Sequence, residues 1–172
     1  MNFILIGYMA SGKSKIGVEL AKVLSFEYLD LDDIIEKNEK NDINSIFKKQ
    51  GELYFRKKEK EYLNKVLNTQ DNTIVSLGGG TPCYFNTMDD LLMHDNATSI
   101  YLKVNIPVLV DRLKEEKAKR PLIAHIETED LLTEFIGKHL FERSAYYSKA
   151  DYIINANGKV DEIVEDIVAK LF

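Results

Sequence analysis

A glycine-rich segment near the N-terminus has the residue types needed to hold a chain of phosphate groups. The phosphate loop, Gly7-Tyr8-Met9-Ala10-Ser11-Gly12-Lys13-Ser14, matches the pattern Gly-x-x-x-x-Gly-Lys-Ser. Its glycines let backbone N–H groups turn toward phosphate oxygens, Lys13 can neutralise the β and γ phosphates, and the Ser14 hydroxyl can ligate Mg²⁺. The residues predicted to bind the nucleotide, with Lys13 also catalytic, are Ala10, Ser11, Gly12, Lys13, Ser14 and Lys15.

Acidic residues follow the second apolar segment, in the run Asp30-Leu31-Asp32-Asp33. We expect this run at the carboxyl edge of a parallel sheet, where open α/β folds bind ligands. Asp30 and Asp32 share a parity along an extended chain, so both can point toward the phosphates. A carboxylate there can hold Mg²⁺ or its water, or orient and deprotonate an acceptor hydroxyl. Asp32 is the predicted catalytic carboxylate, Asp30 a metal contact, and Asp33 the better N-cap of the next helix.

Three successive glycines, Gly78, Gly79 and Gly80, end the apolar segment Ile74-Val75-Ser76-Leu77. They expose backbone where the strand stops, at the edge of the sheet that binds ligands. A flexible turn is the alternative interpretation of the same run. We predict that the three glycines contact the substrate.

Arginine is scarce in this chain. The arginines are Arg56, Arg112, Arg120 and Arg143, so 19 of the 23 basic residues are lysines. A planar guanidinium makes two-pronged contacts with carboxylate or phosphate that lysine cannot make, which suggests reserved roles for the arginines. Each of them taken alone is equally well explained as a surface charge.

Alternation of apolar strands with amphipathic helices predicts the fold. The predicted strands are 3–6, 26–31, 73–77, 98–104 and 152–154. The predicted helices are 13–24, a short one at 32–38, 52–67 with Leu53, Leu63 and Val66 inward, one starting near Pro107, 128–147 and 160–171. This order predicts an α/β three-layer sandwich with a central five-stranded parallel sheet.

The segment Lys114–Arg120 is a run of charged residues, Lys-Glu-Glu-Lys-Ala-Lys-Arg, closed by Pro121. It breaks the apolar pattern of the preceding helix. We predict a mobile charged loop that acts as a lid over the site.

Composition limits the class of protein. A chain of 172 residues with 45% apolar and 30% charged residues fits one folded domain. A net charge of -5 without a basic patch argues against nucleic acid as a partner. Cys83 is the single cysteine, and no apolar run is long enough to span a membrane. We expect a cytoplasmic protein, monomeric, with no membrane partner.

Taken together, these motifs resemble the shikimate kinase family, within the nucleoside-monophosphate-kinase-like group of P-loop NTPases. The resemblance rests on the phosphate loop, on Leu29-Asp30-Leu31-Asp32, on Ser45-Ile46-x-x-x-x-Gly51-Glu52-x-x-Phe55-Arg56-x-x-Glu59, on Ser76-Leu77-Gly78-Gly79-Gly80, on Arg120-Pro121-Leu122 and on Arg143 with Tyr146-Tyr147. It implies a Mg²⁺-dependent transfer of the γ-phosphoryl group of ATP to the 3-hydroxyl of shikimate, a step toward chorismate and the aromatic amino acids.

The same resemblance assigns roles to individual residues. Asp32 would bind the acceptor hydroxyl and act as base, and Arg56, Gly79 and Arg143 would hold the substrate, with both arginines on its carboxylate. Arg120 would reach the phosphates from the lid, binding the nucleotide and taking part in catalysis, and Arg112 would bind the nucleotide near the adenine. The resemblance implies one kinase domain, 1–172, with a lid at about 112–124 and a substrate-binding segment at about 32–60.

Some positions depart from the family pattern. Lys15 stands where threonine is common, Pro82 replaces an aliphatic residue, and the segment 155–158 lacks an arginine that some relatives place against adenine. The alternatives are another small-molecule kinase, acting on gluconate or a nucleotide, or a non-catalytic nucleotide-binding module. Residues predicted to pack rather than to bind ligands are Tyr8, Met9, Tyr146 and Tyr147. No chemistry is assigned to the three histidines.

Overall fold

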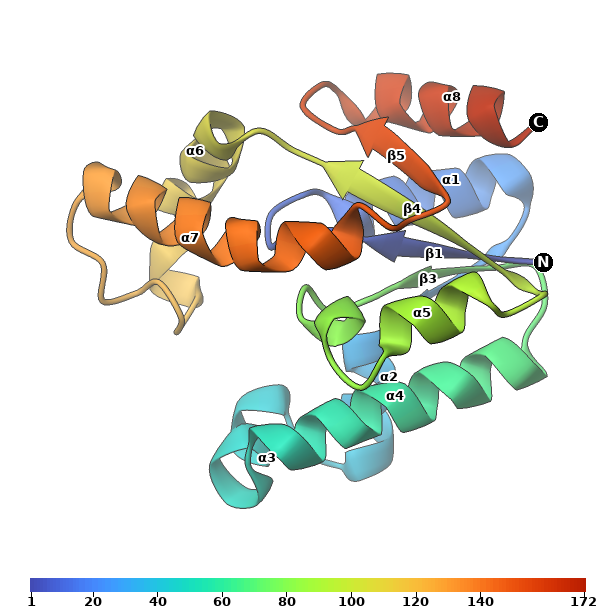
Figure 1. Cartoon of the computed structure of the whole chain (residues 1–172), viewed down its shortest axis with the longest axis horizontal. Coiled ribbons are helices and arrows are strands. Elements are labelled where there is room, and N and C mark those ends of the chain that lie inside the picture. Colours follow the sequence, from blue (N-terminus) through green and yellow to red (C-terminus); the bar gives the residue numbers. More distant parts are fainter.

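Five parallel strands form the centre of the computed structural model, which describes residues 1–172 (Figure 1). They are β1 (Asn2–Ile6), β2 (Glu27–Asp30), β3 (Thr73–Ser76), β4 (Ala97–Lys103) and β5 (Tyr152–Asn155). Their order across the sheet is β2-β3-β1-β4-β5, and every pairing is parallel. The predicted five-stranded parallel sheet is therefore confirmed.

Strand β1 lies in the middle of the sheet, between β3 and β4. Its Ile4 is opposite Val75 of β3 and Ser99 of β4, and all of its residues are buried. Helices cover both faces of a parallel sheet, which is why this strand is apolar without alternation. The strand order changes direction at β1, so the chain leaves β1 at the position where such sheets form a ligand crevice.

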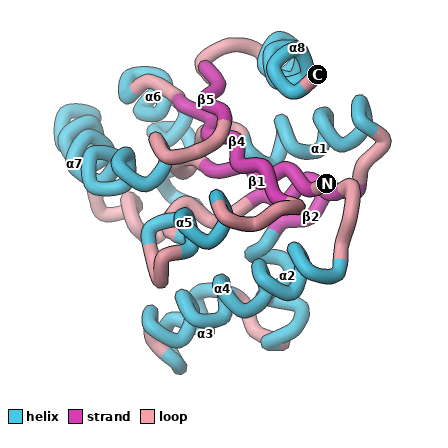
Figure 2. Tube along the Cα trace, turned by 45° about the vertical axis from the view of Figure 1, so that its right-hand side comes forward, coloured by secondary structure: helices cyan, strands magenta, loops and turns pink.

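Helices cover both faces of the sheet. They are α1 (Lys13–Leu24), α2 (Leu31–Glu39), α3 (Ile43–Gln50), α4 (Glu52–Thr69), α5 (Thr87–Leu92), α6 (Ile106–Glu116), α7 (Glu129–Tyr147) and α8 (Val160–Leu171). Figure 2 shows the strands between α1 and α8 on one side and α5 and α7 on the other. The three-layer arrangement is confirmed. None of the helices combines the length and the apolar composition that a membrane span requires.

Two short helices, α3 and α5, were not predicted from the sequence. Helix α3 packs on α4 and α2, at the end of the molecule opposite α8 (Figure 1). The carboxylate of Asp42 begins it by accepting hydrogen bonds from the backbone N–H of Ser45 at 2.9 Å and from its hydroxyl at 2.7 Å. An acidic N-cap before a short apolar run is therefore the signal that identifies this helix.

The inward face of α4 contains Leu63 and Val66, as predicted, but not Leu53. Phe55, Glu59 and Leu63 follow one another at helical spacing and are buried, whereas Leu53 is 62% exposed. The prediction for Leu53 was wrong because it lies off this stripe. Among the predicted packing tyrosines, Tyr147 is fully buried, but the prediction for Tyr146 was wrong, because one position earlier on α7 the side chain points outward.

The charged run Lys114–Arg120 is largely helical. Helix α6 continues to Glu116, and a 3₁₀ turn follows at Lys117–Lys119. The prediction of a loop from residue 114 was wrong, because lysine and glutamate are good helix formers and no apolar partner is needed on an exposed side. The regular structure ends at Arg120, the residue that Pro121 restricts to extended backbone.

Candidate active site

A cleft of about 690 Å³ opens at the carboxyl edge of the sheet. The predicted site residues that line it are Ala10, Ser11, Gly12, Lys13, Ser14, Lys15, Asp30, Asp32, Gly78, Gly79, Arg112 and Arg120. The structure therefore brings the whole predicted phosphate side together with both aspartates and two of the glycines. Three other predicted residues, Arg56, Gly80 and Arg143, lie beside this cleft. They are connected to it by Gly78–Gly80, the glycine turn, because Arg143 lies against Gly79 and Arg56 against Gly80.

The phosphate loop depends on glycine at its first and last turns. A Cβ atom on Gly7 would lie 2.8 Å from Oγ of Ser11 and 3.0 Å from the carbonyl oxygen of Leu102. Gly12 has φ of 94° and is the N-cap of α1. Only glycine adopts this left-handed backbone without strain, and it directs the first N–H groups of α1 into the cleft.

The ammonium group of Lys13 folds back over the loop. Its Nζ donates to the carbonyl oxygens of Gly7 at 2.8 Å and Tyr8 at 3.1 Å. Burial lowers the pKa of Lys13 to about 8, against the opposing influence of Asp30 and Asp32. A positive charge held in this desolvated position is suited to phosphate oxygens, which would replace the carbonyl partners or share the donors with them.

Asp30 begins helix α2. Its Oδ1 accepts from the backbone N–H of Asp32 at 3.0 Å, and the Tyr28 hydroxyl donates to its Oδ2 at 3.3 Å. The prediction that Asp33 is the N-cap was wrong, because the helix starts earlier, at Leu31. We predicted that Asp30 and Asp32 point the same way along an extended chain. This was also wrong, because Asp32 already lies in the first turn of α2. Both carboxylates nevertheless line the cleft.

Asp32 has an unsatisfied carboxylate. Its Oδ1 is buried and has no hydrogen-bond partner within the chain. Burial, and then the negative charges of Asp30 and Glu59, raise the pKa of Asp32 to about 6. A buried acceptor without a donor is rare in folded proteins, and here it belongs to a residue that lines the cleft. The geometry therefore fits a group that receives a hydrogen bond or a proton from a ligand.

We expect Asp32→Asn to stabilise the protein at pH 8 by about 1–3 kcal/mol and to leave it unchanged at pH 4. The folded pKa of Asp32 is about 6 and the unperturbed value is 3.8. The folded state therefore holds this proton more tightly, so stability falls as pH rises through that window. Urea unfolding of both proteins at the two pH values measures the difference. A variant that is less stable at pH 8 would contradict this electrostatic account.

Arg56 is held between aromatic rings and carboxylates. Its Nη1 donates to Oε2 of Glu59 at 2.8 Å, and its Nε and Nη2 donate to Oε1 of Glu52 at 3.3 Å each. Only 10% of its side chain is exposed. Its guanidinium also lies against Gly80, where an added Cβ would be 2.6 Å from both Nη atoms.

Arg143 has no carboxylate partner, whereas Arg56 and Arg120 both form ion pairs. Its Nη1 lies 3.2 Å from where a Cβ on Gly79 would stand. The Tyr147 hydroxyl donates to the carbonyl oxygen of Gly79 and so fixes this part of the turn. A half-buried guanidinium without a counter-ion is suited to an anionic ligand.

The other two arginines line the cleft together with the phosphate loop. Arg112 donates to the carbonyl oxygens of Ala10 at 3.0 Å and Ala156 at 3.2 Å, which links the phosphate loop to the loop before α8. Arg120 pairs with Glu116 at 2.6 Å. Its side chain is 35% exposed, so an incoming phosphate can compete for it.

Mg²⁺ fits the donors of this cleft when phosphates supply the rest. Ser14 and Asp30, which line the cleft, offer a hydroxyl and a carboxylate, the hard oxygen ligands that this ion takes. No group of three or more His, Cys, Asp or Glu residues is arranged to hold a metal alone. Mg²⁺ is commonly held by one or two protein groups together with phosphates and waters, and that is what these residues can provide.

One contact of the site was not predicted from the sequence, the hydrogen bond between Glu59 and Thr81. Glu59 is 1% exposed, and its Oε1 accepts from the Thr81 hydroxyl at 2.5 Å. This links the helix that carries Arg56 to the turn after the three glycines. A glutamate on the apolar stripe of an amphipathic helix, four residues before Leu63, was the signal available in the sequence.

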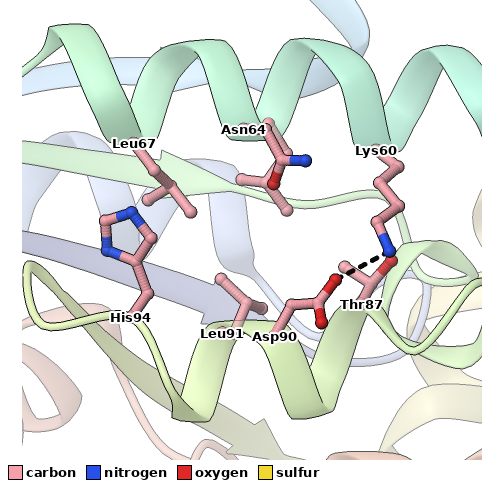
Figure 3. A pocket seen from close by; sticks show the side chains of 8 residues that line it. Lys60, Asn64, Leu67, Thr87, Asp90, Leu91 and His94 are labelled. Carbon is pink, nitrogen blue, oxygen red and sulfur yellow. Dashed lines mark ion pairs between the residues drawn. The ribbon is translucent and has the colours of Figure 1, made fainter.

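A second, smaller cavity of about 250 Å³ lies between α4 and α5. Figure 3 shows Lys60 and Asp90 paired at its rim, 2.7 Å apart, with His94 at the other end. None of the predicted site residues lines it. The two charges at its rim already neutralise each other, and the chemistry of the chain is concentrated in the cleft at the sheet edge.

Comparison with known proteins gives consistent matches over the whole chain. The shikimate kinase family model matches residues 9–172. A shikimate kinase from Flavobacterium johnsoniae is 46% identical over 166 residues, 96% of this chain and 95% of the relative. The structure of shikimate kinase from Bacteroides thetaiotaomicron has a TM-score of 0.90 at 31% identity, covering 99% and 98% of the chains. That of Acinetobacter baumannii, in complex with shikimate, has a TM-score of 0.84 at 27% identity, covering 99% and 92%.

Proposed function

The chain belongs to the shikimate kinase family, and on that premise we propose that the cleft at the sheet edge carries out the family's reaction with the residues described above. The protein is an ATP-dependent kinase. It transfers the γ-phosphoryl group of ATP to the 3-hydroxyl of shikimate and releases shikimate 3-phosphate and ADP. The alternatives of a gluconate or nucleotide kinase, and of a non-catalytic module, are thereby set aside.

ATP is the co-substrate, and we propose the phosphate loop as its cradle. Backbone N–H groups at the start of α1 would donate to the triphosphate, and the Lys13 ammonium lies within the same loop. Arg120 would approach from the turn that follows α6, and Arg112 would brace the loop toward the adenine side. Ser14 and Asp30 would hold Mg²⁺, which neutralises charge that develops on the phosphate oxygens.

We propose that Asp32, the glycine turn and the two acceptor-side arginines hold shikimate. The unpaired guanidinium of Arg143 is free to bind a carboxylate. The Asp32 carboxylate accepts the hydrogen bond of the 3-hydroxyl. As the hydroxyl oxygen forms its bond to the γ phosphorus and the bond to ADP breaks, Asp32 takes the hydroxyl proton.

The finer expectations stay predictions. We propose one kinase domain over 1–172, with the end of α6 and the following turns, 112–124, closing as a lid and 32–60 receiving shikimate. Closure would bring Arg120 to the phosphates and exclude water. We also propose that the protein is monomeric and cytoplasmic and that it has no nucleic-acid or membrane partner.

Gly80→Ala should raise the KM for shikimate on the order of tenfold, because the new methyl group would lie where the Arg56 guanidinium now rests. The backbone of Gly80 is right-handed, with φ of -88°, so alanine is excluded only by this contact. Steady-state kinetics with shikimate varied at saturating ATP measures the effect.

Gly137→Ala is the matched control, because its Cβ would meet only Ile106 Cδ1 at 3.9 Å. We expect it to leave both KM values unchanged. Equal KM values for shikimate in Gly80→Ala and the native protein would contradict the proposal that Arg56 binds shikimate.

One observation carries the assignment: a buried carboxylate oxygen of Asp32 without a donor, in the same cleft as Lys13 of the phosphate loop. A coupled assay of ADP release with shikimate, gluconate or a nucleoside monophosphate tests it. We expect turnover with shikimate above the rate without an acceptor. Nucleotide binding without turnover of any acceptor, or a preference for one of the other two, would overturn the proposal.

A further inference from the structure

Tyr84, a residue without a role in the reaction described above, has its ring against the guanidinium of Arg56. The ring centroid of Tyr84 is 4.4 Å from Cζ of Arg56, closer than the rings of Phe55 and Phe47 at 5.3 Å and 6.0 Å. A guanidinium over the face of an aromatic ring is attracted to it electrostatically. Tyr84 is therefore the principal aromatic partner of this arginine.

The hydroxyl of Tyr84 reaches the same carboxylate that Arg56 uses. It donates to Oε1 of Glu52 at 3.0 Å, and that oxygen also accepts from Nε and Nη2 of Arg56 at 3.3 Å each. The Tyr84 side chain, the Glu52 carboxylate and the Arg56 guanidinium thus each contact the other two. Glu52 is 53% exposed, so it is the more loosely held of the two carboxylates on Arg56.

The remaining side of Arg56 is fixed by the turn that leads to Tyr84. Gly80 lies against its guanidinium, and Thr81 donates to Glu59, the buried carboxylate that holds Nη1. The segment from Gly80 to Tyr84 therefore touches Arg56 or one of its carboxylates at three positions.

We propose that Tyr84 is a positioning residue for the acceptor substrate. It fixes Arg56 in the orientation that meets the carboxylate of shikimate, so the inference rests on the proposed function. The ring limits the rotamers of a long side chain before shikimate binds, which lowers the entropy lost on binding. The hydroxyl gives Glu52 a second donor, so that Nε and Nη2 of Arg56 can turn to the substrate carboxylate without leaving Glu52 unpaired.

Tyr84→Ala should raise both the KM and the calorimetric dissociation constant for shikimate about tenfold, because both contacts are lost. Its KM for ATP and its kcat should change less than about twofold, since Tyr84 lies on the acceptor side only. Tyr84→Phe keeps the ring and loses the hydroxyl. We expect it to restore most of the affinity, to within about threefold of the native value.

Phe85→Ala is the matched control. Phe85 is the next residue, 40% exposed where Tyr84 is 38% exposed, and its ring contacts no arginine. We expect no change in either KM. In a protein that already carries Arg56→Lys, Tyr84→Ala should add less than about twofold, because lysine cannot make the contacts that Tyr84 supports.

An unchanged shikimate KM in Tyr84→Ala would overturn the proposal. So would a parallel rise in the KM for ATP with a lower thermal midpoint, which would indicate a structural role. A full tenfold effect in the Arg56→Lys background would show that Tyr84 does not act through Arg56. Failure of the proposed function is a separate result, because then the native protein would not turn over shikimate.

Discussion

Lys13→Met should lower kcat with shikimate by about 10³-fold. Methionine nearly matches the length of the lysine side chain and removes the charge and its donors. The lysine Nζ lies within the phosphate loop, 2.8 Å from the Gly7 carbonyl oxygen, in a desolvated position. Charge that develops on the γ phosphoryl oxygens would lose its nearest protein cation.

Rapid-quench kinetics at saturating ATP and shikimate measures the chemical step of Lys13→Met. Lys22→Met on the same helix is the control, because Lys22 is exposed and paired with Glu19 away from the cleft. Circular dichroism checks that all the proteins are folded. A loss of less than about tenfold in Lys13→Met would mean that the lysine only binds the nucleotide.

Asp32→Asn should lower kcat by about 10²- to 10⁴-fold, because the amide cannot take the hydroxyl proton. The pH dependence provides a second test. The pKa of Asp32 is raised to about 6, so kcat/KM for shikimate in the native protein should fall as pH drops below that value. The residual rate of Asp32→Asn should lack this acidic limb.

The neighbouring carboxylate is the control for Asp32. Asp33 is exposed on the first turn of the same helix, so Asp33→Asn should keep its activity within about twofold. Equal losses in the two variants would point to a general charge effect. Retention of the acidic limb in Asp32→Asn would assign that limb to another group.

The phosphate side of the site could be predicted from sequence because its information is local. Eight consecutive residues, Gly7 to Ser14, supply both the backbone conformation and the positive charge that phosphate binding requires. Continuous apolar runs identified the buried strands for the same reason, and their order along the chain implied a parallel sheet. The cleft residues of the phosphate loop consequently lie where they were predicted.

The acceptor side depends on contacts between distant segments, which no local pattern reveals. Glu59 meets Thr81, and Glu52 meets Tyr84, across two elements that are far apart in sequence. The position of Asp32 was reached from a mistaken register, since the helix begins at Leu31 and carries Asp32 into the cleft by its first turn. The helical conformation of the charged end of α6 was not predicted. Lysine and glutamate have a high helix propensity, which is sufficient there without an apolar face.

Identification of the product tests the central claim most directly. The protein would be incubated with equimolar ATP and shikimate, and the product examined by correlating its phosphorus nucleus with the protons of the ring. We expect one phosphorylated product, with phosphorus coupled to the proton on carbon 3, formed in step with ADP. Phosphate on another hydroxyl, or ADP formed with inorganic phosphate while shikimate stays unmodified, would contradict the assignment of Asp32 and the arginines to the acceptor.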